Sequence, residues 1–268
     1  MSSESPQGQG IGHTFLEYVR EVGRNFPDFV REYALFIGMH IKSFRSQALP
    51  SEYLYGDKGD VILLPGYGER WPFMGKIARY FHNQGFSIHI LEGLEKTRNL
   101  GRVEDYVKEL EGLLRKIDFE NCIIVTHSKG GLIAMQYLIQ LLEQTLNVQS
   151  PLFINIAVPY GGTLLGYLDR LLFNLTHGYE LLPRSAVIIK IQKGMKQIPE
   201  RIKEKIISIS AELGDNHIIP SGNALLPPQL GIENFAVRIY GHTRILFSDS
   251  LLKLLGEILI QRVSIPQN

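Results

Sequence analysis

The sequence has few of the features that mark several classes of protein. It holds one cysteine, Cys122, in 268 residues, so an intrachain disulfide and a cysteine-based zinc site are excluded. Its eight histidines include no H-E-x-x-H spacing, and we therefore expect no bound metal and no other cofactor. A formal net charge of +1 gives no reason to expect a nucleic-acid partner.

Long apolar runs and a targeting signal are also missing. No stretch of about 18 uncharged apolar residues occurs, so the sequence predicts no transmembrane helix. Residues 1–12 are polar and rich in glycine, serine and glutamine, unlike a secretory signal peptide. We therefore expect a cytoplasmic protein and keep peripheral contact with a membrane or another lipid interface as an open alternative.

The chain does contain short apolar segments that alternate with segments of helical periodicity. With 44% hydrophobic residues it can bury one large core. The alternation favours an α/β protein with a mainly parallel sheet and helices on both faces. Strands are predicted at 61–64, 86–91, 122–125, 152–157, 206–210 and 235–240, and core helices at 71–83, 103–117, 129–144 and 245–260.

The most informative motif is Thr-His-Ser-Lys-Gly at residues 126–130. It joins a predicted strand to an amphipathic helical segment, so Ser128 lies at the tip of a strand–turn–helix unit. Such a turn presents a serine hydroxyl beside helix N–H groups, which favour a developing anion. The residues two before and two after the serine must be small; Gly130 is, whereas Thr126 is larger than the usual glycine. A helix N-cap is the alternative interpretation of Ser128.

Three further strand ends carry polar or glycine-rich loops. Residues 65–68, Pro-Gly-Tyr-Gly, follow the first strand, although proline and glycine also mark ordinary turns. Two later strands lead into loops that contain Asp215 and His242. A histidine and a carboxylate in such loops suit a general base and the acid that orients it. Asp215 as a turn former and His242 as a structural residue are the alternatives.

These motifs resemble those of bacterial lipases and esterases of the α/β-hydrolase superfamily, in the group similar to triacylglycerol lipases and GPI inositol-deacylases. The resemblance covers about residues 58–262. Four further matches support the resemblance. His127 precedes the serine, as in the H-S-x-G-G form of the elbow, and residues 215–220 resemble a D-N-x-I-P acid loop. Residues 157–163 resemble a P-H-G-G-T loop in which Tyr160 replaces histidine, and residues 180–185 resemble an L-x-P-G-S stretch in which Arg184 replaces glycine.

The resemblance implies the α/β-hydrolase fold and a catalytic triad. Its members occur in the chain order Ser128, Asp215, His242, which is the order of that fold. Ser128 is then the nucleophile, His242 the general base and Asp215 the acid that orients the base. The backbone N–H groups of Tyr67 and Lys129 are expected to form the oxyanion hole.

The identity of the acid is open from the sequence. The common D-x-x-V-P spacing would place it at Asn216, which cannot carry a charge. We expect Asp215 instead, with His217 as an extra loop residue, because a loop tolerates an insertion better than a triad tolerates the loss of its carboxylate. Glu212 is the alternative acid.

Residues 1–55 are predicted to form an N-terminal helical extension ahead of the catalytic domain, 56–268. The apolar residues Phe29, Tyr33, Phe36, Ile37, His40, Ile41 and Phe44 share one helical face. We expect this face to pack on the core and not on a membrane, because nearby acidic residues offset the arginines, a balance that suits anionic lipid poorly. These acidic residues are Glu17, Glu21, Asp28 and Glu32.

Residues from about 160 to 204 lie between two core strands, where we expect a helical cap or lid insertion. Its first part is rich in leucine from Leu164 to Phe173, and its later part is basic from Lys190 to Lys205. An apolar acyl-binding lid with a basic outer face is our hypothesis, and a solvated charged helix is the alternative.

Three classes of function follow from these motifs. The first is a lipase or esterase that cleaves a small-molecule or lipid ester through an acyl-enzyme on Ser128. The second is an acyltransferase, phospholipase or amidase on the same fold, because fold and triad fix acyl transfer but not the substrate. The third is a binding protein on a hydrolase fold without catalysis.

Overall fold

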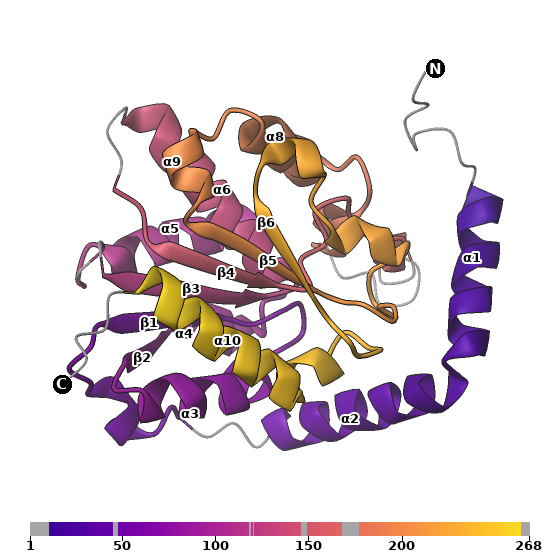
Figure 1. Ribbon diagram of the computed structural model, residues 1–268, viewed down its shortest axis with the longest axis horizontal. Coiled ribbons are helices and arrows are strands. Elements are labelled where there is room, and N and C mark those ends of the chain that lie inside the picture. Colours follow the sequence, from indigo (N-terminus) through magenta and orange to yellow (C-terminus); the bar gives the residue numbers. More distant parts are fainter. Residues whose placement is uncertain are drawn as a thin grey trace.

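A single parallel sheet runs through the computed structural model (Figure 1), which describes residues 11–44, 48–117, 119, 121–145, 149–167 and 177–263. The strand order is β2-β1-β3-β4-β5-β6, and each neighbouring pair is parallel. The strands are β1 (Asp60–Leu64), β2 (Ser87–Ile90), β3 (Cys122–His127), β4 (Leu152–Ile156), β5 (Ile206–Ala211) and β6 (Glu233–Val237). Because parallel strands end at one edge, the loops that carry the predicted site residues gather there.

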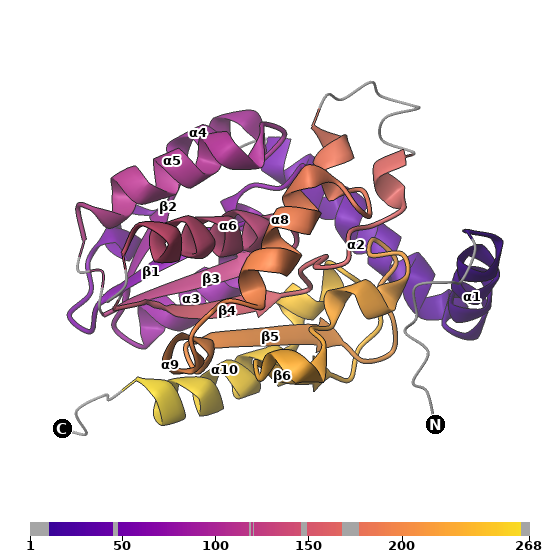
Figure 2. The same ribbon diagram turned by 90° about the horizontal axis from the view of Figure 1, so that it is seen from above.

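Helices cover both faces of the sheet (Figure 2). Side chains alternate along β1, so Ile62 and Leu64 pack with α5, α6 and α8, whereas Val61 and Leu63 pack with α3 and α10. The helices are α1 (Ile11–Arg24), α2 (Phe26–Phe44), α3 (Gly75–Asn83), α4 (Glu92–Thr97), α5 (Val103–Leu114), α6 (Lys129–Gln144), α8 (Ala186–Met195), α9 (Glu200–Lys203) and α10 (Asp249–Arg262). Short 3₁₀ turns lie at Ser51–Leu54, Trp71–Met74, Gly178–Leu181, Ser221–Ala224, Pro228–Leu230 and Arg244–Phe247.

The predicted α/β architecture is confirmed, and the differences lie at element ends. The helix predicted over 71–83 begins as a 3₁₀ turn that contains Pro72 and becomes α-helical only afterwards. The last helix begins later than predicted, at Asp249, because Ser248 caps it and accepts a hydrogen bond from the Ser250 N–H at 3.2 Å.

Helices α1 and α2 form an arm beside the sheet, with α2 along one side of the core and α1 turned away from it (Figure 1). The apolar face predicted to pack on the core divides in two. Tyr33 and Phe36 are partly buried, whereas Ile37 and Ile41 are exposed, so the prediction is wrong for these two isoleucines. The apolar residues span too wide an arc of the helix for one contact to cover. In the described part of the chain, no helix is both long and apolar enough to span a bilayer.

The segment predicted as a cap contains a helix that packs on the core. Helix α8 buries Ile188, Ile191 and Met195 in the same cluster as α6. The basic residues Lys193 and Lys196 lie at its exposed side. Most of the leucine-rich part of the predicted lid, residues 168–176, lies outside the described residues, so the lid and the domain limits stay predictions.

Candidate active site

The strand–turn–helix around Ser128 has the geometry of a nucleophile elbow. Ser128 joins β3 to α6 with φ 52° and ψ −122°, a conformation that costs energy for any residue with a side chain. Its own N–H donates to the Ile156 carbonyl at 3.0 Å. Helix α6 lies so close to β1 that a Cβ on Gly130 would be 2.0 Å from the Leu64 carbonyl oxygen. Only glycine fits at residue 130, which explains that part of the motif.

Thr126, where glycine is usual, is accommodated by its neighbours. Its Oγ1 donates to Oδ1 of Asn155 on β4 at 2.8 Å, so the buried hydroxyl has a partner. A Cβ on Gly131 would lie 3.0 Å from the same Oγ1 and closer still to Val158. The second glycine of the elbow therefore provides the space that the threonine side chain takes up.

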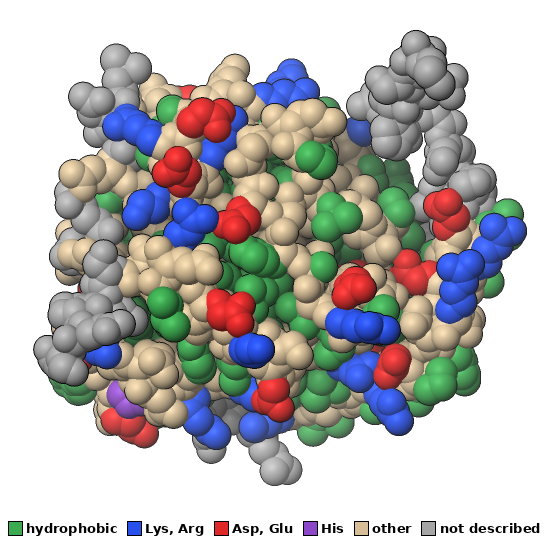
Figure 3. Space-filling model, viewed as in Figure 1, with side chains coloured by type: hydrophobic (Ala, Val, Ile, Leu, Met, Phe, Trp, Pro, Cys, Tyr) green, Lys and Arg blue, Asp and Glu red, His purple; other side chains and the backbone are tan. Residues whose placement is uncertain are grey.

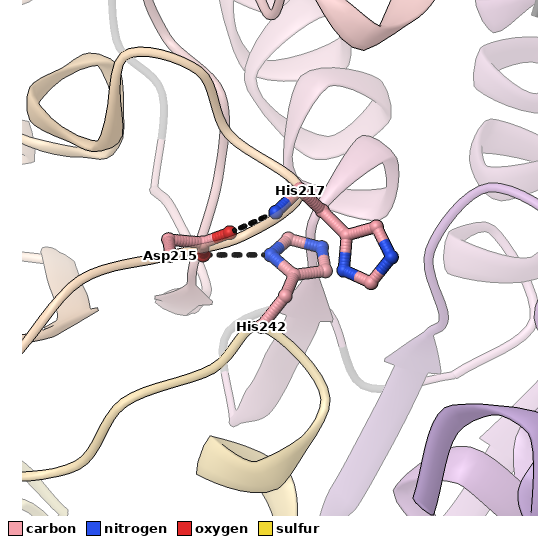
Figure 4. Close-up of side chains that lie close together, drawn as sticks. All are labelled: Asp215, His217 and His242. Atoms are coloured by element: carbon pink, nitrogen blue, oxygen red, sulfur yellow. Dashed lines mark hydrogen bonds and ion pairs between the residues drawn. The ribbon is translucent and has the colours of Figure 1, made fainter. Parts of the chain in front are cut away.

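Asp215 and His242 come together at the ends of the loops after β5 and β6. Asp215 Oδ2 lies 2.7 Å from His242 Nδ1, and its Oδ1 accepts the N–H groups of His217 and Ile218, each at 2.8 Å (Figure 4). Both side chains are buried. Because Asp215 engages Nδ1, Nε2 is the His242 nitrogen that can exchange a proton with another group.

The pair shifts both pKa values in the directions that a charged pair needs. Burial acts to raise the pKa of Asp215, but the charge of His242 and the hydrogen bonds outweigh it, so the pKa stays below its usual value. Burial likewise acts to lower the pKa of His242, but the Asp215 carboxylate raises it above the usual value overall. The carboxylate therefore favours a protonated imidazole.

The residues around Asp215 bear on the choice of acid. Oδ1 of Asn216 accepts the backbone N–H of His242 at 3.1 Å. The residue at the common acid position thus holds the backbone of His242, while Asp215 holds its ring. Glu212, the alternative acid, is exposed and lines a different cavity, beside α1.

Ser128 and His242 line one cavity of about 330 Å³. Its wall includes Tyr33 and Phe36 from α2, and Tyr67 from the loop after β1. Further apolar residues of the lining are Pro159, Leu165, Leu181 and Ile218, and its polar residues include Glu69, Thr163 and His217. The structure therefore brings together the predicted nucleophile, the predicted base and one predicted oxyanion residue, and adds a helix that sequence analysis placed outside the catalytic domain.

Lys129, the other predicted oxyanion residue, turns its side chain away from the solvent. Its Nζ donates to the carbonyl oxygens of Asn99 at 3.1 Å and Gly101 at 2.5 Å. The same ammonium group lies 5.2 Å from the centre of the Tyr67 ring, within cation–π range. The Lys129 side chain thus braces Tyr67, while the oxyanion role of the two backbone N–H groups stays a prediction.

Sequence analysis missed Glu69, a buried acid at this site. Its Oε2 accepts the Gly66 N–H at 2.6 Å and lies 2.8 Å from His127 Nδ1. The other ring nitrogen of His127, Nε2, donates to the His242 carbonyl at 3.1 Å. Burial acts to raise the pKa of Glu69, but the charge of His127 and its hydrogen bonds hold that pKa below the usual value. Glu69 therefore links the loop after β1 to the backbone of His242.

Sequence analysis also missed the role of Glu32 on α2. This side chain is fully buried, and its two oxygens accept the N–H groups of Thr243 at 2.7 Å and Arg244 at 2.9 Å. Burial raises the pKa of Glu32 despite these hydrogen bonds. The Arg244 guanidinium in turn donates to Asp28 at 2.8 Å. Helix α2 therefore holds the loop that carries His242.

His217 stands beside the buried pair and is more than an extra loop residue. Its ring centre lies 5.0 Å from that of His242 (Figure 4), and burial lowers its pKa to about 3, so it is neutral at physiological pH. Asp215, His217 and His242 offer ligand atoms within 4.8 Å of one another, a spacing that suits a metal ion. Hydrogen bonds already engage both Asp215 oxygens and one His242 nitrogen, which favours the hydrogen-bonded arrangement; the absence of a metal stays a prediction.

Comparison with solved structures identifies the fold as that of the α/β-hydrolases. An alpha/beta hydrolase enzyme from a lagoon-sediment metagenome is 16% identical with a TM-score of 0.55, and the match covers 78% of this chain and 93% of that one. A Bacillus licheniformis lipase is 15% identical with a TM-score of 0.54 (82% and 95% covered). A Paleococcus ferrophilus monoacylglycerol lipase is 14% identical with a TM-score of 0.53 (77% and 96% covered). No protein-family model and no curated protein matches the sequence.

Proposed function

We propose that this protein is a serine hydrolase that cleaves carboxylic esters through Ser128, Asp215 and His242. The observation that carries the proposal is the buried 2.7 Å contact between Asp215 and His242, beside a cavity that His242 shares with Ser128. The strained turn at Ser128 supports the same role, because it places the serine at a helix N-terminus beside the cavity.

In the proposed reaction, His242 takes the proton of Ser128 as its Oγ attacks the acyl carbonyl carbon. Asp215 keeps the His242 ring in the required tautomer and stabilises its protonated form. Backbone N–H groups of Tyr67 and Lys129 hold the tetrahedral oxyanion, and each such donor is worth about 2.7–4 kcal/mol of the barrier. His242 then protonates the leaving alcohol. Water releases the acid from the acyl-enzyme by the same steps.

The lining of the cavity supports an acyl group as the part of the substrate next to Ser128. Phe36, Leu165 and Leu181 provide an apolar wall, and the volume of about 330 Å³ is at the small end for ligand pockets. Two of the matched solved structures are named as lipases, which agrees with an ester as the substrate.

The test is steady-state hydrolysis of p-nitrophenyl esters from acetate to palmitate, with wild type beside Ser128→Ala. A fluorophosphonate probe should add its mass to wild type and not to this variant. Ser51→Ala, which changes an exposed serine, is the matched control and should keep full activity and labelling. Full ester hydrolysis by Ser128→Ala would refute the proposal. Labelling without ester hydrolysis would point to an amidase or acyltransferase on the same serine.

A further inference from the structure

The outer side of α2 carries a row of exposed apolar side chains. Phe26 is 59% exposed, Val30 51%, Ile37 55% and Ile41 62%. Together with exposed Ala34 they form what we call the outer apolar face. Their spacing places them on one side of the helix. Helix α1 also carries exposed Leu16 and Val19.

In the folded protein, the exposed charged side chains of α1 and α2 are mostly basic. Three of the four acids that balance the arginines in the sequence turn inward or are paired. Glu32 is fully buried, Glu21 accepts a hydrogen bond from Ser221 at 2.8 Å, and Asp28 accepts one from Arg244 at 2.8 Å. The exposed charged residues of α1 and α2 in the described range are Arg20, Arg24, Arg31 and Lys42, with Glu17 as the one acid. Of these cations Arg31 is itself paired with Asp28 at 3.3 Å.

Figure 3 shows hydrophobic and basic side chains near one another at the lower right, where α2 meets α1, with acidic side chains among them. An apolar helical face with arginine and lysine at its margin matches the chemistry of a bilayer with anionic headgroups: apolar side chains enter the acyl boundary and cations meet phosphates. A second copy of this chain fits less well, because a two-fold contact would set the same cations against one another.

An adjoining side of the same helix faces the candidate active site. Tyr33 and Phe36 line the cavity that holds Ser128 and His242. One helix therefore separates that cavity from the outer apolar face. A lipid surface that meets the outer side of α2 lies beside the wall of the site.

We propose that the outer apolar face of α2 docks the protein on an anionic lipid surface, so that esters embedded in that surface reach the site. The docking itself rests on the helix alone, and only the substrate class rests on the proposed function. Helix α2 then lies at the membrane interface and does not cross the bilayer. Ile37 and Ile41 enter the boundary of the acyl chains, while Arg24 and Lys42 remain among the headgroups.

The experiment measures co-sedimentation with vesicles of phosphatidylcholine alone or mixed with phosphatidylglycerol, in a Ser128→Ala background so that no hydrolysis alters the lipid. The test variant is Ile37→Asp with Ile41→Asp. The matched control is Ile260→Asp, a residue 78% exposed on α10. The vesicle partition coefficient should fall by about tenfold or more in the test variant, because two apolar side chains no longer enter the bilayer. The control should bind like the parent protein.

A second pair of measurements tests the charge. Arg24→Glu with Lys42→Glu should weaken binding to the mixed vesicles several-fold, and so should added salt, since each basic residue near an anionic surface contributes separately. Binding that is equal in the parent and the isoleucine variant, or absent in the parent, would overturn the proposal. So would a stable dimer of the parent that the isoleucine variant disrupts, because the face would then be a contact between copies.

The proposed catalytic function is tested apart from docking. Hydrolysis of the water-soluble ester p-nitrophenyl acetate by the chain with intact Ser128 reports on the triad alone, and the isoleucine variant should match wild type there. Hydrolysis of a long-chain ester placed in mixed vesicles should fall together with the partition coefficient. Vesicle binding without any esterase activity would leave the docking proposal standing and remove the proposed function.

Discussion

Replacing Glu32 with alanine should destabilise the protein, because the N–H groups of Thr243 and Arg244 lose their acceptor. A buried donor without a partner costs about 1–3 kcal/mol, so two lose roughly 2–6 kcal/mol. The change also removes a buried carboxylate whose pKa burial raises, which offsets part of the loss. We expect a net loss of about 2–4 kcal/mol. At about 2–4 °C per kcal/mol, Tm should fall by roughly 4–16 °C.

The same variant should slow hydrolysis, since Thr243 directly follows His242. A displacement of about 1 Å at a catalytic group costs on the order of 10²-fold in rate. We therefore expect kcat for p-nitrophenyl acetate to fall by about 10²-fold. KM should change less, because Tyr33 and Phe36 still line the cavity.

Thermal melting by circular dichroism and steady-state kinetics well below Tm would test this reasoning. Glu32→Gln keeps one acceptor oxygen and should fall between wild type and Glu32→Ala in both Tm and kcat. Glu52→Ala removes an exposed carboxylate and should change neither. An unchanged kcat together with a Tm within about 1 °C of wild type would refute the role of Glu32 as a positioning residue.

Four further predictions concern the candidate site. The acid limb of kcat/KM should have its midpoint above the usual histidine pKa, because a protonated His242 cannot act as base and Asp215 raises its pKa. Asp215→Asn should lower kcat by about 10⁴-fold. It should also move that limb to lower pH in a pH–rate profile, because His242 loses the carboxylate that raises its pKa most, while burial still lowers it. Glu69→Gln should cost about 1.5–3 kcal/mol in urea unfolding, because a charged acceptor is lost. Gly130→Ala should fail to give a soluble fold, because the new Cβ would lie 2.0 Å from the Leu64 carbonyl oxygen.

The variants at Asp215 and Gly130 have matched controls in the chain. Asp105→Asn changes an exposed aspartate at the start of α5 and should leave the pH profile unchanged. Gly112→Ala places a methyl group where nothing lies within 4 Å, inside a helix, and should stabilise the fold by about 0.5–1 kcal/mol. A soluble, active Gly130→Ala would contradict the close approach of α6 to β1. Wild-type stability in Glu69→Gln would contradict its role as a buried acceptor.

The parts of the structure that sequence predicted well are those encoded by local patterns. The strand before Ser128 is an uninterrupted apolar run, buried on both faces of a parallel sheet, and α6 follows it with helical periodicity. Glycine at residue 130 signalled the tight approach to the neighbouring strand. Asp215 and His242 were found because each follows a strand that ends at the same edge of the sheet.

The residues that sequence analysis missed act through contacts that local patterns do not encode. Glu32 lies in a helix with several other charges, so its pattern indicates a solvated residue, whereas the fold buries it completely. Glu69 follows a glycine-rich loop and carries no periodic signal, and its partner His127 is 58 positions away. Ile37 and Ile41 share the periodicity of Phe36, and periodicity alone cannot tell which part of a wide apolar arc meets the core.

The hydrogen bond from the Thr243 N–H to Glu32 joins residues 211 positions apart, and this separation has a consequence for folding. During synthesis α2 is made before the sheet, and it cannot form this contact until the loop after β6 has been made. Closing so large a loop is entropically costly and comes slowly. We therefore expect α2 to dock on that loop late in folding, and this docking completes the wall of the cavity. A newly made chain would thus have an incomplete cavity, with the inner side of α2 exposed, until almost all of its sheet has formed.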